Sequence, residues 1–216
     1  CQLMPKIFTQ IVARPDSSRT ARRIEEQGFD GISFVDSQNL SGDVYVAMAT
    51  AAVATETLEL STGVTNPVTR HPAVTASAIG SVQRVAGDRV QLGIGRGDSA
   101  LAHIGRSPAR VIDFERYLIA VQKYLKGEEV LFEDLKFGET VSRGVDELGL
   151  AASAIASQIN WLPGRLGKVD VEVAATGPKV ISAAARHSDR IMFALGADHE
   201  RIKWGIEIAR KARKDE

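Results

Sequence analysis

Four clusters of polar residues follow short apolar runs in this sequence, and they contain the side chains best suited to chemistry. Each apolar run has the length and composition of a buried strand, and a segment of helical periodicity follows each cluster. Because the carboxyl ends of parallel strands lie at one edge of a sheet, we expect the four clusters to converge there. A solvated connection is the alternative interpretation of any one cluster on its own. The clusters are residues 36–39, 65–71, 95–99 and 176–179.

The residue types in these clusters limit the chemistry that they could perform. None contains a pair of carboxylates, a nucleophile with its base, or metal ligands at the usual spacing. The sequence therefore predicts no metal site. Three of its four histidines, His103, His187 and His199, are interpreted as ordinary surface or core residues.

Two of the clusters would allow a ligand to approach the backbone closely. The glycines of Gly93-Ile94-Gly95-Arg96-Gly97 are spaced G-x-G-x-G rather than G-x-G-x-x-G, so a dinucleotide fingerprint is a weak interpretation. Small residues there would instead admit a flat ring or a phosphate. The sequence TGPK at residues 176–179 begins a helix and offers N–H groups to an anion, although a plain capped helix is an equal alternative.

The elements that carry these clusters repeat a strand, a polar turn and a helix about every 30 residues. This rhythm is typical of parallel strands joined by right-handed helical crossovers. Four consecutive repeats of similar length favour an α/β fold of the (β/α)8 TIM-barrel type over an open sheet. The expected strands are residues 6–13, 31–35, 57–64, 90–94, 169–175 and 190–195, and the expected helices are residues 18–27, 44–55, 73–86, 109–125, 180–186 and 198–211.

Residues 128–168 break this rhythm, because they lack a steady hydrophobic period and contain five glycines. We interpret them as an insertion on the top face of the barrel, either a lid over the site or a disordered segment. Within the insertion we expect a hairpin near residues 132–137 and a short helix over residues 151–159.

The pattern shows about six βα units, whereas a complete barrel needs eight. We therefore interpret residues 1–216 as a single domain from which the last two units are absent. A truncated or partly ordered chain would account for the difference, and so would strands hidden within the insertion.

Overall composition excludes several classes of partner. The 216 residues include 27 basic and 27 acidic side chains, so the net charge is zero and neither nucleic acid nor a membrane surface is an expected partner. A single cysteine excludes an internal disulfide framework and indicates a reducing compartment. Because no signal pattern or spanning stretch is seen, we expect a cytoplasmic protein. A small-molecule substrate fits these limits.

Three long segments of the sequence resemble one known family. Residues 63–82 (GVTNPVTRHPAVTASAIGSV), 87–109 (GDRVQLGIGRGDSALAHIGRSPA) and 173–195 (VAATGPKVISAAARHSDRIMFAL) are similar, in this order, to the luciferase-like flavin oxidoreductase superfamily. The similarity is greatest to its deazaflavin (F420)-dependent branch, which includes the methylenetetrahydromethanopterin reductases. It extends over residues 8–212 and weakens over residues 128–168.

The resemblance implies a (β/α)8 barrel that binds its cofactor at the carboxyl ends of the strands. It implies hydride transfer between coenzyme F420 and a small organic substrate. Within the superfamily, the alternative is an FMN (FMNH2)-dependent monooxygenase that uses molecular oxygen. A non-catalytic relative with a truncated barrel is the alternative from another class. The resemblance also implies a homodimer.

Candidate site residues follow from the resemblance, position by position. Asp36 matches the acidic residue near the ring and the substrate, where it would tune protonation as the catalytic candidate; an N-cap or turn aspartate is the alternative interpretation. Ser37 follows it and argues against a histidine-based protonation role. The other cofactor-binding candidates are Gly63 and Val64 as a non-prolyl cis peptide against the ring face, Thr65 and Asn66 at the ring edge, Gly95 and Gly97 as a small-residue wall, and Ala175, Thr176, Gly177 and Pro178 near the tail phosphate.

Overall fold

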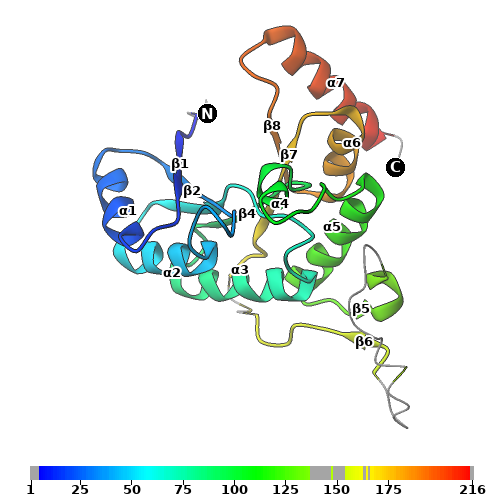
Figure 1. The fold of residues 1–216 in the computed structure, drawn as a ribbon, viewed down its shortest axis with the longest axis horizontal. Coiled ribbons are helices and arrows are strands. Elements are labelled where there is room, and N and C mark those ends of the chain that lie inside the picture. Colours follow the sequence, from blue (N-terminus) through cyan, green and yellow to red (C-terminus); the bar gives the residue numbers. More distant parts are fainter. Residues whose placement is uncertain (1–4, 137–146, 148–153, 163, 165, 215–216) are drawn as a thin grey trace.

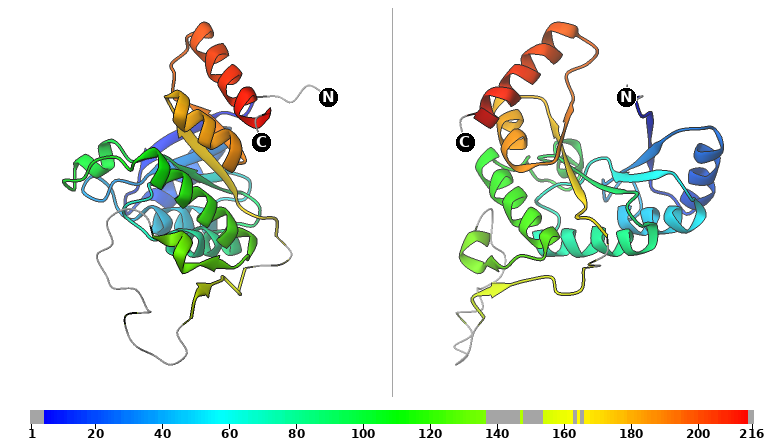
Figure 2. Two further views of the ribbon diagram at one scale, coloured as in Figure 1. Left: turned by 90° about the vertical axis from the view of Figure 1, so that its right-hand side faces the viewer. Right: turned by 180° about the vertical axis from the view of Figure 1, so that it is seen from behind.

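The computed structural model describes residues 5–136, 147, 154–162, 164 and 166–214. Its main feature is a sheet of six parallel strands in the order β1-β2-β3-β4-β7-β8, curved into an arc with helices along its outer side (Figure 1). Among the described residues, β1 pairs with β2 alone and β8 with β7 alone, so these strands form the two edges. Figure 2 shows the opening of the arc between β1 and β8 from behind. The expected barrel-type α/β fold is therefore confirmed as a half-barrel of six units.

The six expected strands and six expected helices are all present, with ends displaced by a few residues. The short helix α4 (Ser99–Ala102) was not expected, because four residues are too few to show a period. The strands are β1 (Phe8–Val12), β2 (Gly31–Val35), β3 (Glu59–Thr62), β4 (Val90–Ile94), β7 (Asp170–Ala175) and β8 (Arg190–Phe193). The other helices are α1 (Ser17–Glu26), α2 (Val44–Ala54), α3 (Pro72–Ala86), α5 (Val111–Lys126), α6 (Pro178–His187) and α7 (His199–Lys214).

The hydrophobic core lies between the outer face of the sheet and these helices. Alternate residues of each strand face the helices, as Val171 and Val173 of β7 show, and both are fully buried. They pack in one cluster with residues of α3 and α5 such as Ile79 and Val121. The intervening residues, Glu172 and Ala174 in β7, face the inside of the arc. Strand alternation therefore decides which side chains can reach the rim.

The insertion contains a small separate sheet instead of the hairpin and helix that we expected. Strands β5 (Val130–Leu131) and β6 (Ala156–Ser157) pair antiparallel, and a 3-10 helix, η1 (Phe132–Leu135), follows β5. The hairpin prediction is therefore wrong for residues 132–136, and the helix prediction is wrong for residues 154–159; residues 137 and 151–153 lie outside the described chain. The extended form has a physical reason, because it lets Val130 and Ile159 enter the core on both sides of the pairing.

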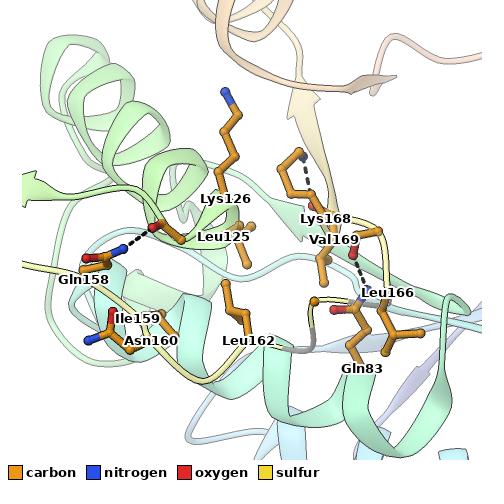
Figure 3. Close-up of a pocket in the computed structure, with 13 residues that line it drawn as sticks. Gln83, Leu125, Lys126, Gln158, Ile159, Asn160, Leu162, Leu166, Lys168 and Val169 are labelled. Atoms are coloured by element: carbon orange, nitrogen blue, oxygen red, sulfur yellow. Dashed lines mark hydrogen bonds between the residues drawn. The ribbon is translucent and has the colours of Figure 1, made fainter.

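The described residues of the insertion lie at the amino edge of the sheet and not at the top face that we expected. Each helix returns the chain to the amino ends of the strands, so a segment that follows α5 must begin there. Gln83 near the end of α3 donates to the Gly167 carbonyl at 2.7 Å, and Gln158 donates to the Gly127 carbonyl at 2.6 Å. Figure 3 shows these bonds around a cavity of about 480 Å³ beside Leu125 and Leu162.

Candidate functional site at the carboxyl rim of the half-barrel

The carboxyl ends of five strands surround a cavity of about 280 Å³, which we call the rim pocket. Its floor consists of small residues that face the inside of the arc, and the turn after β4 with helix α4 forms one wall. The volume lies just below the range of about 300–1,000 Å³ for ligand sites, so the pocket suits a ring more than a complete nucleotide-sized ligand. The floor residues are Val35, Gly63, Gly95, Ala174 and Ala194.

Six of the eleven candidate residues line the rim pocket. Four strand ends contribute them, so segments that are far apart in the sequence meet here as expected from parallel topology. The peptide bond between Gly63 and Val64 is cis in the structure. The six are Asp36, Gly63, Val64, Gly95, Gly97 and Thr176.

The other five candidates do not line the rim pocket. Thr65 and Asn66 are fully buried behind its wall. Ala175 faces the helices as part of the core, because strand alternation points it away from the inside of the arc. Gly177 is the N-cap of α6, and Pro178 borders a separate cavity of about 510 Å³ between α5 and α6.

Two glycines of the site are required by close contacts. A Cβ atom on Gly63 would lie 2.7 Å from Cβ of Ser33, closer than side-chain atoms approach. Gly97 has a φ of +85°, and a Cβ atom there would lie 2.8 Å from Cβ of Asn66. Gly97 therefore permits both the left-handed turn after β4 and the contact between this turn and residues 65–71, which we call the rim loop.

The Asp36 side chain is almost completely buried, and donors occupy both of its oxygens. Thr65 donates its hydroxyl to Oδ2 at 2.6 Å, and Gln38 donates to Oδ1 at 2.7 Å. Arg70 forms a fork across the carboxylate, with Nη1 to Oδ2 at 2.5 Å and Nη2 to Oδ1 at 3.3 Å. The N-cap of α2 is Asp43 and not Asp36, so the N-cap interpretation of Asp36 is wrong. Asp36 is instead the acceptor centre of a network around the rim loop.

Arg70 lies at the centre of this network. Its Nη2 also donates to Oδ2 of Asp43 at 3.2 Å, and its guanidinium carbon lies 5.0 Å from the centroid of the Tyr45 ring. Burial on its own lowers the pKa of Arg70, but the hydrogen bond and charge of Asp36, with Tyr45 and Asp43, outweigh burial and raise this pKa above its ordinary value. The guanidinium is therefore held in its charged form by its partners.

Four buried polar side-chain atoms near the site have no hydrogen-bond partner among the described residues, two of them being the Tyr45 hydroxyl and Oγ1 of Thr69. The other two are Nδ2 of Asn66 and the hydroxyl of Ser37, and of the four residues only Ser37 lines the rim pocket. An unpaired buried polar group costs about 1–3 kcal/mol, so it usually has a ligand or water to pair with. Together with a floor of small residues, the unpaired Ser37 hydroxyl of the lining fits a flat ligand with polar edge atoms. The rim pocket therefore fits the ring system of a flavin or deazaflavin.

Sequence reasoning missed several residues of the site. Val35 and Ala194 in the floor could have been found by strand alternation, since each lies on the inner face at the end of its strand. Arg96 and Asp98 are charged residues of the lining within a turn that we interpreted for its glycines alone. Arg70 lies in a cluster that we had singled out, but no pattern in the sequence indicates its partners.

Neither a metal centre nor a membrane span is found in the part of the chain that the structure describes. No three His, Cys, Asp or Glu side chains in this part lie close enough together to hold a metal ion. No helix in it is long and apolar enough to cross a membrane.

A parallel α/β arc with a polar pocket at the carboxyl rim defines a protein of the TIM-barrel type. Within this class, residues 12–216 match the family of luciferase-like monooxygenases, and the chain belongs to that family. The sequence is 31% identical over 202 residues to a 5,10-methylenetetrahydromethanopterin reductase from Methanolobus tindarius. This alignment covers 90% of the chain but 56% of the relative, so the chain spans about half the length of that protein.

Solved structures show the same fold. The coenzyme F420-dependent tetrahydromethanopterin reductase from Methanopyrus kandleri superposes with a TM-score of 0.74 and 17% identity, over 97% of this chain and 61% of that one. An F420-dependent secondary alcohol dehydrogenase in complex with an F420–acetone adduct superposes with a TM-score of 0.73 and 21% identity, over 96% and 64%. At these identities the superpositions establish the fold.

Proposed function

We propose that the rim pocket binds the ring of coenzyme F420 and that the chain acts in hydride transfer between this coenzyme and a small organic substrate. The observation that carries the proposal is the floor of small residues from five strands, bordered by a buried and unpaired hydroxyl. A flat polar-edged ring matches both features. The relatives at 31% identity are 5,10-methylenetetrahydromethanopterin reductases, which belong to the branch whose resemblance implies coenzyme F420, and this favours the deazaflavin over FMN.

Different residues of the rim pocket would contact different parts of the cofactor. Gly95 and Ala174 would lie under the ring, and the Ser37 hydroxyl would pair with a polar atom of the ligand. Coenzyme F420 itself supplies the carbon that accepts or donates the hydride. The N-terminus of α6 begins beside Thr176, where free backbone N–H groups favour the anionic tail. The chain thus binds and orients the cofactor and excludes water from its lower face.

A titration of the purified full chain with F420 and with FMN tests this proposal. We expect saturable binding of F420, followed by fluorescence, with a lower Kd than for FMN. Ala174→Leu fills the pocket and should abolish binding, whereas Ala174→Ser keeps the floor small and should retain it. Circular dichroism confirms that both variants are folded.

The other outcomes of the titration correspond to other functions. Tighter binding of FMN would point to the FMNH2-dependent monooxygenase, the activity for which the family is named. Binding of neither would contradict the proposal and favour a non-catalytic relative. Equal binding to Ala174→Leu and wild type would place the cofactor outside the rim pocket.

A further inference from the structure

The Arg70 guanidinium joins three parts of the chain that form the rim. Asp36 follows β2, Asp43 and Tyr45 begin α2, and Arg70 itself belongs to the rim loop between β3 and α3. The arginine contacts all three acidic or aromatic partners at once. Because its side chain is 14% exposed and the Asp36 side chain 1%, solvent screens this pair weakly.

The backbone of Arg70 is held as firmly as its side chain. The Tyr117 hydroxyl of α5 donates to the Arg70 carbonyl at 3.0 Å and lies 2.6 Å from the Thr75 hydroxyl. Burial raises the pKa of Tyr117 well above its ordinary value, so the phenol stays protonated and can donate. The Asn66 side-chain oxygen accepts from the amides of Val68 and Thr69 at 3.0 Å, which adds a turn of hydrogen bonds within the loop.

We propose that Arg70 is a positioning residue that fixes the rim loop before any ligand arrives. The loop does not itself line the rim pocket, but it follows the lining residue Val64 and packs against the lining residue Gly97, so its order sets the shape of the pocket. Asp36 acts with it as the buried counter-charge, and its role in the site is exerted through Arg70 and Thr65. The predicted effect on ligand affinity rests on the proposed function. The predicted order of the rim loop does not. Asp36 therefore fixes the loop and is not the group that exchanges a proton with the substrate.

Hydrogen exchange of the ligand-free chain tests the loop order directly. Arg70→Met removes both the charge and the fork, and we expect amides of residues 63–71 to exchange about tenfold faster. Arg89→Met is the matched control, because Arg89 also bonds several carbonyls but lies at the amino edge, for example with the Leu58 carbonyl at 2.7 Å. It should lower the melting temperature without changing exchange in the rim loop.

Binding of F420 tests the consequence for the site. If disorder of the rim loop in Arg70→Met leaves the rim pocket in its binding-competent shape about one-tenth of the time, the Kd rises about tenfold, whereas Arg89→Met should retain the wild-type Kd. Arg70→Lys keeps the charge but loses the two-oxygen fork, so it should give an intermediate Kd. Asp36→Asn combined with Arg70→Met should bind no more weakly than Arg70→Met alone, because both changes break one unit.

The outcomes separate the two proposals. Unchanged exchange and an unchanged Kd in Arg70→Met would overturn the positioning role. Faster exchange in the rim loop of this variant, with no binding of F420 or FMN by the wild type, would support the positioning role and contradict the proposed function. If the two substitutions weakened F420 binding additively in the double variant, Asp36 would have a separate role at the ligand.

Discussion

Asp36 and Ser37 are neighbours in the sequence and both border the rim pocket, but the polar atoms of Asp36 are hydrogen-bonded within the protein and the hydroxyl of Ser37 is not. Each oxygen of Asp36 already accepts hydrogen bonds from within the protein. The Ser37 hydroxyl has no partner among the described residues. At the scale of single residues, the group left available for a ligand is therefore the neutral hydroxyl and not the carboxylate.

Ser37→Ala should change stability and affinity in opposite directions. Removal of an unpaired buried hydroxyl should stabilise the ligand-free chain by about 1 kcal/mol, whereas loss of its bond to the ligand should weaken F420 binding about threefold to tenfold. Thermal unfolding and a fluorescence titration measure the two effects.

Ser41→Ala is the matched control for this substitution. The Ser41 hydroxyl donates within the same turn, at 3.0 Å from the Ser37 carbonyl and 3.2 Å from the Val35 carbonyl, so its loss should destabilise the chain. If Ser37→Ala also lowered the melting temperature and left the Kd unchanged, the hydroxyl would be a structural group.

At the scale of elements, helix α3 connects the rim loop to the core, and His71 is its N-cap. Nδ1 of His71 accepts from the amide of Ala73 at 3.2 Å, which requires an unprotonated nitrogen. Partial burial lowers the pKa of His71 below its ordinary value of 6.5. The folded chain therefore binds fewer protons at this site than the unfolded chain does at mildly acidic pH.

The sign of the pH effect follows from this difference in proton binding. The stability contributed by His71 is fully present above about pH 6.5 and decreases as the pH falls below that value, because the unfolded chain protonates first. His71→Asn retains an N-cap acceptor that does not titrate. We expect urea unfolding at about pH 7.5 and about pH 5.5 to show a smaller loss of stability in His71→Asn than in wild type. A loss of equal size in both proteins would exclude His71 as its source.

Regular elements could be predicted from the sequence, because their periods are local. Each parallel strand with its following helix repeats the same hydrophobic pattern, and this pattern located all six units. The pairing of β5 with β6 could not be predicted, because it joins two-residue segments about 25 residues apart through their backbones alone.

In the candidate site too, features that depend on nearby residues in the sequence could be predicted, and contacts between distant segments could not. Six of the residues that the resemblance indicated border the rim pocket, because strand order alone brings their turns together. Which turn contacts which depends on the curvature of the sheet, and so the pairing of Arg70 with Asp36 and Asp43 was not visible in the sequence. The direction of each strand residue was available from alternation, and it would have excluded Ala175.

At the scale of the whole molecule, the outer surface of α2 and α3 is unusually apolar. Val46 and Val53 of α2 are 64% and 78% exposed, and Val74 and Val85 of α3 are each about half exposed. The sequence of α2 contains no charged residue. A helix that is apolar on all sides is normally covered, and two uncharged surfaces of this kind can cover each other.

We therefore expect the chain to form a homodimer through α2 and α3. Val53→Lys should place unpaired charges in the contact and shift the mass in light scattering from dimer towards monomer. Ile155→Lys is a matched control, because Ile155 is 76% exposed at the amino edge and should leave the mass unchanged. A monomeric wild type, or an equal effect of both substitutions, would contradict this interface.

The fastening of the small β5–β6 sheet to the ends of α3 and α5 has a practical consequence. Tyr124 and Ser157 hold this sheet in place with a bond of 2.7 Å, on the side of the arc remote from the ring-sized hollow. A fluorophore or surface tether attached at Ile155 would leave the entrance for small molecules facing the solution. The chain can thus be immobilised through the amino edge of the sheet while ligand binding is measured at the carboxyl rim.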